Sequence, residues 1–192
     1  GSSLEWRIEF RGAHHDPGFC PRAVAVSAIE GWSGRIDLPE DASTRRWHQW
    51  VRTPTAGCAP GIAVLGFACD EGVRRNHGRI GAAEGPKALR KIRSNLPVMG
   101  DAPLYDAGTV ACTDGDLEAA QARYAEAMAS LLDAGHLAVG LGGGHEIAYA
   151  SYLGLAKHLE ARRPRVAIVN LDAHFDLRRQ EQGSSGTPFL QA

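Results

Sequence analysis

Short runs of apolar residues alternate along this chain with longer segments in which apolar residues recur every three or four positions. The continuous runs predict strands covered on both faces, because such strands need no polar side. They lie at 62–68, 104–110 (the weakest), 137–141 and 166–169, and the last run leads directly into Asp172.

The periodic segments between these runs predict helices. The clearest begins at a cap at Thr113 or Asp114 and ends at Gly135. Its buried stripe is predicted at Leu117, Ala120, Tyr124, Met128 and Leu131. Two further stripes are Ala88, Leu89, Ile92 and Leu96 after Pro86, and Ile147, Ser151, Leu155 and Leu159.

This order of strands and helices, joined by short connections, predicts a fold of the α/β class. We expect three layers, α/β/α, around a mainly parallel sheet. Residues 1–59 are interpreted as an N-terminal extension with a short helix at 45–52, whose tryptophans pack on the main body. Residues 60–192 are interpreted as a partial α/β domain, giving one domain overall.

Composition narrows the function classes. The 192 residues carry 21 basic and 22 acidic side chains, so no broad field favours nucleic acid or an anionic membrane. No apolar run is long enough to span a bilayer. The four cysteines form no C-x-x-C pair, which predicts reduced thiols in a cytoplasmic protein.

The segment with the most chemistry is Asn-Leu-Asp-Ala-His-Phe-Asp at 170–176. In extended backbone, every second side chain projects to the same side, so Asp172, His174 and Asp176 are expected on one face. Two carboxylates and an imidazole this close together would lack partners unless a cation lay among them.

His145 follows the glycine turn 142–144 at the end of another predicted strand. Ligands of open parallel sheets bind beyond the carboxyl ends of the strands, so His145 is expected beside Asp172, His174 and Asp176. This nitrogen and oxygen set suits manganese or another divalent ion, and two such ions can activate a shared hydroxide. Taken singly, His145 also fits a helix-start residue and Asp172–Asp176 a solvated loop.

Two other interpretations fit less well. An EF-hand loop starting at Asp172 would need glycine at its sixth position and glutamate at its twelfth, where this chain has Leu177 and Gly183. In a dinucleotide-binding G-x-G-x-x-G turn starting at Gly140, His145 occupies the place of the third glycine.

The motifs Gly-Gly-Gly-His-Glu (142–146) and 170–176 resemble those of the ureohydrolase (arginase/agmatinase) superfamily. The resemblance implies a parallel α/β fold, a two-manganese centre and hydrolysis of C–N bonds in guanidino or amidino groups. The closer similarity is to the formimidoylglutamase subgroup of histidine degradation. The segments that carry it are 31–37, 47–49, 70–86, 174–178 and 184–189.

The resemblance implies roles for individual residues. His145, Asp172 and Asp176 would bind one Mn²⁺, and Asp172 with His174 the second, so that Asp172 and His174 act in catalysis through a metal-activated hydroxide. Arg178 would bind a carboxylate of N-formimidoyl-L-glutamate. The remaining substrate-binding candidates are Ser184, Ser185, Arg75 and Asn76. A surface salt bridge is the alternative for Arg178.

The chain also departs from the family pattern. No histidine follows His174, which argues against arginase itself, and the later Asp-x-Asp that supplies two more metal ligands is absent. We therefore expect four of six ligands and a fold that lacks its C-terminal third. Two alternatives stay open: another ureohydrolase, such as an agmatinase or guanidino-acid hydrolase, or a non-catalytic metal-binding relative. The expected partner is a small-molecule substrate, and the sequence is compatible with a homo-oligomer.

Overall fold

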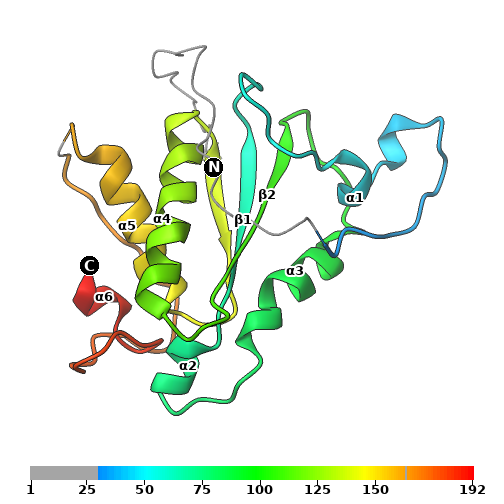
Figure 1. Cartoon of the computed structure of the whole chain (residues 1–192). Coiled ribbons are helices and arrows are strands. Elements are labelled where there is room, and N and C mark those ends of the chain that lie inside the picture. The colour runs from blue at the N-terminus through cyan, green and yellow to red at the C-terminus, as the bar shows by residue number, and fades with distance from the viewer. Residues whose placement is uncertain (1–29, 163) are drawn as a thin grey trace, which may run out of the picture.

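A parallel sheet lies at the centre of the chain (Figure 1). Its strands are β1 (Ile62–Ala68), β2 (Leu104–Ala111) and β3 (Leu137–Leu141), in the order β2-β1-β3. The computed structural model describes residues 30–162 and 164–192, so Cys20 and residues 1–29 of the predicted extension lie outside it.

Helices cover both faces of this sheet. The long helices α4 (Leu117–Asp133) and α5 (Ile147–Leu159) pack together on one side, and α3 (Gly85–Arg93) lies on the other (Figure 1). Shorter helices are α1 (Trp47–Trp50), α2 (Glu71–Arg75) and α6 (Pro188–Gln191), with 3-10 turns at Ala42–Thr44 and Ala82–Glu84. The predicted α/β/α fold is confirmed. The sequence did not indicate α2 or α6.

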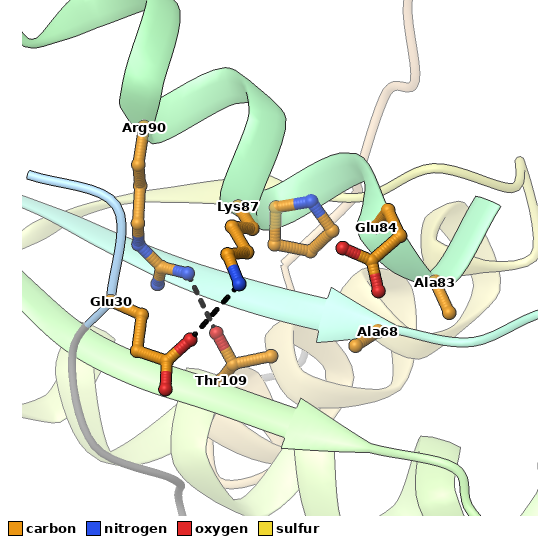
Figure 2. A pocket seen from close by; sticks show the side chains of 8 residues that line it. Glu30, Ala68, Ala83, Glu84, Lys87, Arg90 and Thr109 are labelled. Carbon is orange, nitrogen blue, oxygen red and sulfur yellow. Dashed lines mark hydrogen bonds and ion pairs between the residues drawn. The ribbon is translucent and has the colours of Figure 1, made fainter. Parts of the chain in front are cut away.

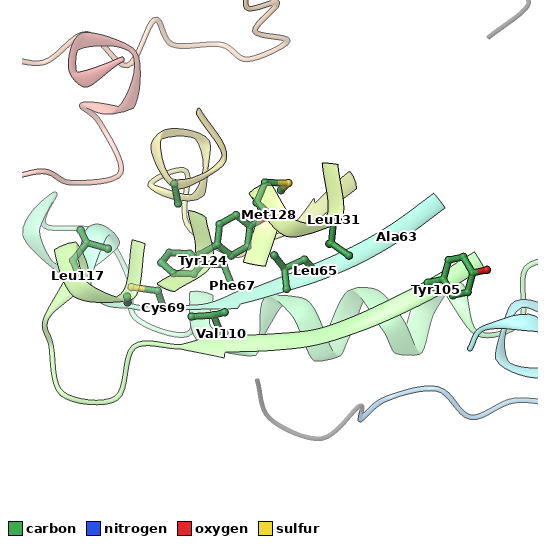
Figure 3. Packing of buried hydrophobic residues seen from close by; sticks show 12 residues of the cluster. Ala63, Leu65, Phe67, Cys69, Tyr105, Val110, Leu117, Tyr124, Met128 and Leu131 are labelled. Carbon is green, nitrogen blue, oxygen red and sulfur yellow. The ribbon is translucent and has the colours of Figure 1, made fainter. Parts of the chain in front are cut away.

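The central strand β1 is buried on both faces, as its continuous apolar run predicted. Ala63, Leu65 and Phe67 join the core beneath α4 (Figure 3). Val64 joins a second cluster with Leu104. All five residues of the predicted α4 stripe are buried. The helix is capped by Asp116 instead of Thr113 or Asp114, because the Asp116 carboxylate accepts from the Ala119 N–H. Gly135, at φ +80°, ends the helix as predicted.

The predicted apolar stripe of α3 is only partly right, since Leu89 packs against the cluster of Val64 and Leu104 but Leu96 is 43% exposed. Pro86 and Arg90 are its buried residues, and Ile92 is 72% exposed. The reason lies on β2, where the buried Asp106 carboxylate accepts two hydrogen bonds from Arg90, at 2.6 and 2.9 Å. Arg90 also donates to Thr109 Oγ1 beside a small cavity of about 220 Å³ (Figure 2).

Residues 31–35 pack against this same side of the sheet. The indole N–H of Trp32 donates to Asp106 Oδ2 at 2.6 Å. The Ser33 and Arg35 backbone N–H groups bond to the Ser94 hydroxyl and the Asn95 side chain, just past α3. In the described structure, the first segment of the family resemblance therefore holds the chain onto α3 and β2.

The strand expected at 166–169 does not form. Its residues have no strand hydrogen bonds, Val169 is 84% exposed and Leu171 is 95% exposed. Continuous apolar sequence predicts burial only if other elements cover it. Within the described residues, β3 is the edge of the sheet and nothing covers this segment. The described helices include none long and apolar enough to cross a membrane.

Candidate metal centre

His145, Asp172 and Asp176 come together beyond the carboxyl end of the sheet. Each offers one ligand atom, and these atoms all lie within 4.8 Å of one another. His145 Nδ1 is 3.7 Å from Asp172 Oδ2 and is in close contact with the Asp176 carboxylate. The meeting of the 142–146 turn with 172–176 was predicted, and the structure places the three side chains accordingly.

The glycine turn positions His145. A Cβ at Gly143 would lie 1.7 Å from the Ala82 carbonyl oxygen, so only glycine fits where the two turns cross. His145 then precedes α5, and its ring packs edge-on against Phe189 with ring centroids 5.5 Å apart. Two segments far apart in sequence, 142–146 and 188–191, thus hold the imidazole.

Asp172 and Asp176 lie on a loop. The strand that was predicted at 166–169 to lead into them does not form. Asp172 Oδ1 accepts from the His174 N–H at 2.8 Å, and this bond is the main cause of the lowered pKa of Asp172. Asp176 adopts φ +49°, the left-handed region, and turns the chain back toward His145.

His174 lies beside this group of three. Its side chain is 78% exposed, and its Nδ1 is 3.4 Å from Asp172 Oδ1. Among the described residues, the group of ligand atoms that lie within 4.8 Å of one another does not include His174. Its role as a ligand of a second ion stays a prediction.

This donor set fits a divalent cation. One imidazole nitrogen and two carboxylates are the mixed donors that borderline-to-hard ions prefer. The two carboxylates lie close together, and the described part of the chain places no lysine or arginine in contact with either one. A cation between them would remove their mutual repulsion.

Three of the predicted substrate-binding residues are linked beside this centre. Arg178 Nη1 donates to Asn76 Oδ1 at 2.7 Å, and Asn76 Nδ2 donates to Ser185 Oγ at 3.1 Å. Asn76 and Arg178, with residues 173–177, line a cavity of about 410 Å³. A guanidinium and a cavity therefore lie next to Asp176.

The other two candidates hold the surrounding loops. Arg75 pairs with Glu71 and Glu118 and donates to the Gly183 carbonyl oxygen at 3.0 Å. Ser184 is 1% exposed, and its hydroxyl hydrogen-bonds with Gln180. A substrate contact from either residue stays a prediction.

Sequence reasoning missed Glu146, although it stands in the glycine motif. Its carboxyl group is 1% exposed, and both of its oxygens lack a hydrogen-bond partner of normal geometry among the described residues. Burial is the main cause of its raised pKa, which the nearby Cys69 thiol and Gly72 N–H only partly offset. The only signal in the sequence was an acidic residue directly after the predicted ligand.

Comparison with known proteins gives a consistent family. Residues 60–192 match the model of the arginase family. The formimidoylglutamase of Chromobacterium violaceum is 56% identical over 161 residues, which make up 83% of this chain and 51% of that protein. That of Aeromonas hydrophila is 57% identical over 163 residues, with shares of 83% and 52%. The chain thus spans about half the length of the curated relatives it matches.

Solved structures similar to this chain agree with the match to the arginase family. Trypanosoma cruzi formiminoglutamase, in a crystal structure with Mn²⁺₂, superimposes with a TM-score of 0.61 and 31% identity. The match covers 69% of this chain and 47% of that one. Formimidoylglutamase from Bacillus subtilis has a TM-score of 0.66 at 21% identity, covering 85% and 51%, and supports the fold alone.

Proposed function

Because the chain belongs to the arginase family, we propose that its function is that of the formimidoylglutamases, of whose length it spans about half. The reaction is hydrolysis of N-formimidoyl-L-glutamate to L-glutamate and formamide. The observation that carries this proposal is the convergence of His145, Asp172 and Asp176 beside the cavity that contains Arg178.

The metal in this proposal is manganese, with two ions in the complete site. His145, Asp172 and Asp176 would hold one ion, and Asp172 with a reoriented His174 would contribute to the other. When bound, such ions supply Lewis acidity and make a water acidic enough to serve as a nucleophile near neutral pH. With the ions bound, the carboxylates of Asp172 and Asp176 would neutralise part of the positive charge of the metal.

Arg178 provides recognition at the other end of the substrate. Glutamate carries two carboxylates, and a guanidinium pairs with a carboxylate through two directional hydrogen bonds. Asn76 accepts from Arg178, and Ser185 in turn accepts from Asn76, so the guanidinium is oriented before substrate arrives. Preorientation lowers the entropy lost on binding.

The proposal includes a cytoplasmic location. Cys58, Cys69 and Cys112 are free thiols in the described structure, as expected in a reducing compartment.

Hydrolysis assays test the function. We would load Mn²⁺ onto this chain and onto a chain extended to the length of its relatives, and compare formimidoylglutamate, agmatine and arginine as substrates. Preference for formimidoylglutamate is expected. Arg178→Met should raise KM for it by about tenfold or more, the cost of about one charged hydrogen-bonded contact, with less effect on kcat.

Other results would change the proposal. Preference for agmatine or arginine would contradict the subgroup. Mn²⁺ binding without hydrolysis by either chain would favour a non-catalytic metal-binding relative.

A further inference from the structure

Glu146 has the least usual environment in the described structure for an acidic residue. Its backbone carbonyl accepts from Gln121 Nε2 at 3.0 Å, which fixes it to α4. Its side chain is fully buried, yet neither carboxyl oxygen has a hydrogen-bond partner of normal geometry among the described residues. A buried polar group whose hydrogen bonds are poorly made costs free energy, so Glu146 calls for an explanation.

Two glycines enclose this carboxyl group. A Cβ at Gly72 would lie 2.4 Å from Glu146 Cδ, and one at Gly144 would lie 2.1 Å from its Oε2. Neither glycine has a positive φ, so their backbone conformation does not require glycine. The close approach of the Glu146 side chain does.

The two glycines belong to the two halves of the proposed site. Gly144 immediately precedes His145. The Gly72 carbonyl oxygen accepts from the N–H of Asn76 at 3.2 Å and from that of Ser185 at 3.0 Å. One glycine therefore adjoins the metal ligand, and the other organises the residues that orient Arg178.

We propose that Glu146 is a positioning residue whose side chain, clamped between Gly72 and Gly144, sets the separation of the metal-binding end of the site from its carboxylate-binding end. This inference rests on the proposed function, because the proposed function is what identifies a metal-binding end and a carboxylate-binding end of the site. The contact is one of shape: the Glu146 side chain is buried, and the bond from Gln121 ties its backbone to α4. A shorter side chain at Glu146 would let α2 and the 142–146 turn move closer together or shift relative to one another.

The first readout is amide hydrogen exchange of the metal-free 192-residue chain. Glu146→Ala should speed exchange at Ser185 and Asn76 by about tenfold, since both amides bond to Gly72, while β1 amides stay protected. Glu146→Gln keeps the shape and should stay within about threefold of wild type. Met128→Ala, a core truncation in α4, is the control for general destabilisation.

A compensating pair tests the contact itself. Gly72→Ala alone should also speed exchange at Ser185, because its new methyl group meets the carboxyl group. In Glu146→Ala this methyl group has space, so the double variant should exchange more slowly than either single variant.

The second readout is Mn²⁺ affinity, measured by electron paramagnetic resonance well below the melting temperature of each variant. Glu146→Ala should weaken binding by about tenfold or more, the scale of lost support behind a metal ligand. Glu146→Gln should restore the affinity, and Met128→Ala should not change it.

Three results would overturn the inference. They are exchange at Ser185 that rises no more in Glu146→Ala than in Met128→Ala, a Gln variant as impaired as the Ala variant, or a double variant that is worse than both singles. Failure of wild type to bind Mn²⁺ would instead count against the proposed metal site. The exchange experiment would still decide the role of Glu146 in that case.

Discussion

Two clusters of charged side chains in this molecule differ in whether they are complete. On the α3 side, Asp106 is fully buried, and it accepts from Arg90, Trp32 and the Gly108 backbone. At the carboxyl end of the sheet, the side chains near Asp172 and Asp176 that can carry positive charge are, among residues 30–162 and 164–192, the His145 imidazole and the exposed His174.

This difference distinguishes a cluster that stabilises the fold from a cluster that can bind a ligand. A buried ion pair with all its hydrogen bonds made holds elements together, and it has no capacity for a further ligand. A half-exposed group with more acceptors than donors is costly for folding and is suited to a cation. Residue types alone do not distinguish the two clusters, since both contain aspartates.

The largest expected effect comes from breaking the complete cluster. Arg90→Met leaves Asp106 buried without its charged partner and should lower the free energy of unfolding by about 3–5 kcal/mol. Urea denaturation measures this change. The control is Arg35→Ala, whose pair with Asp37 is 70% exposed on the arginine side and should cost less than about 1 kcal/mol. Equal losses would show that the Asp106 cluster is not specially stabilising.

The incomplete cluster of Asp172 and Asp176 should instead make the chain more stable when a metal ion binds to it. Mn²⁺ at about one hundred times its Kd should stabilise the chain by about 2.7 kcal/mol, because only the folded state assembles the site. Asp176→Asn should remove most of this gain without destabilising the metal-free chain, since asparagine also tolerates a positive φ.

Thermal melting with and without Mn²⁺ measures the gain. Asp133→Asn, on α4 and outside the proposed centre, is the control and should keep it. A metal-free Asp176→Asn chain much less stable than wild type would mean that this aspartate is structural after all.

A smaller change tests one hydrogen bond of the complete cluster. Trp32→Phe keeps an aromatic ring near Trp47 and removes the N–H that donates to Asp106. Loss of a bond to a charged acceptor should cost about 2 kcal/mol. Trp50→Phe, which removes an N–H donating to the Ala102 carbonyl, should cost about 1 kcal/mol in the same assay. The reverse order would contradict the special stability of the Asp106 cluster.

The smallest expected effect on stability concerns Glu71. Its carboxylate is paired with arginines, as Asp106 is, but part of its ion-pair network is exposed to solvent. Hydrogen bonds from Arg74 are the main cause of its lowered pKa, about 2. A lowered pKa stabilises the fold above the ordinary value of 4.5, and this contribution is lost as pH falls toward 2.

Glu71→Gln should therefore be less stable than wild type at pH 6 and equal to it near pH 2. The difference should be about 1 kcal/mol at most, since the outer partners Arg74 and Glu118 are more than half exposed. Urea denaturation across this pH range measures it, and a difference that persists at pH 2 would exclude the ionic cause.

Much of the fold followed from local patterning. The strands β1, β2 and β3 and the stripe of α4 were predictable from continuous apolar runs and from helical periodicity. The run at 137–141 was wrong about burial, since β3 is a strand but most of its residues are exposed in the described structure. The buried face of α3 was not fully predictable, since Arg90 is buried only because Asp106, on another element, receives it. The run at 166–169 had the pattern of a strand, but a strand also needs a neighbour and a cover.

The candidate site also has parts that the sequence predicted and parts that it did not. Residue types and spacing predicted that His145 lies beside Asp172 and Asp176, because ligands of parallel sheets bind beyond the carboxyl ends of strands, and the structure brings these three together. That they bind a divalent metal stays a prediction. Spacing also placed His174 in the set, on the assumption of extended backbone, and the structure has a loop there instead.

Only the packed structure revealed which side chains support the site. Glu146 lies between Gly72 and Gly144, and the latter two are 72 positions apart in sequence, so no local pattern could indicate that contact. The same holds for the link between Asn76 and Arg178, 102 positions apart. Patterning determined the chemistry that this chain can offer, whereas tertiary packing decided which groups meet, because contacts between distant residues depend on how whole elements pack.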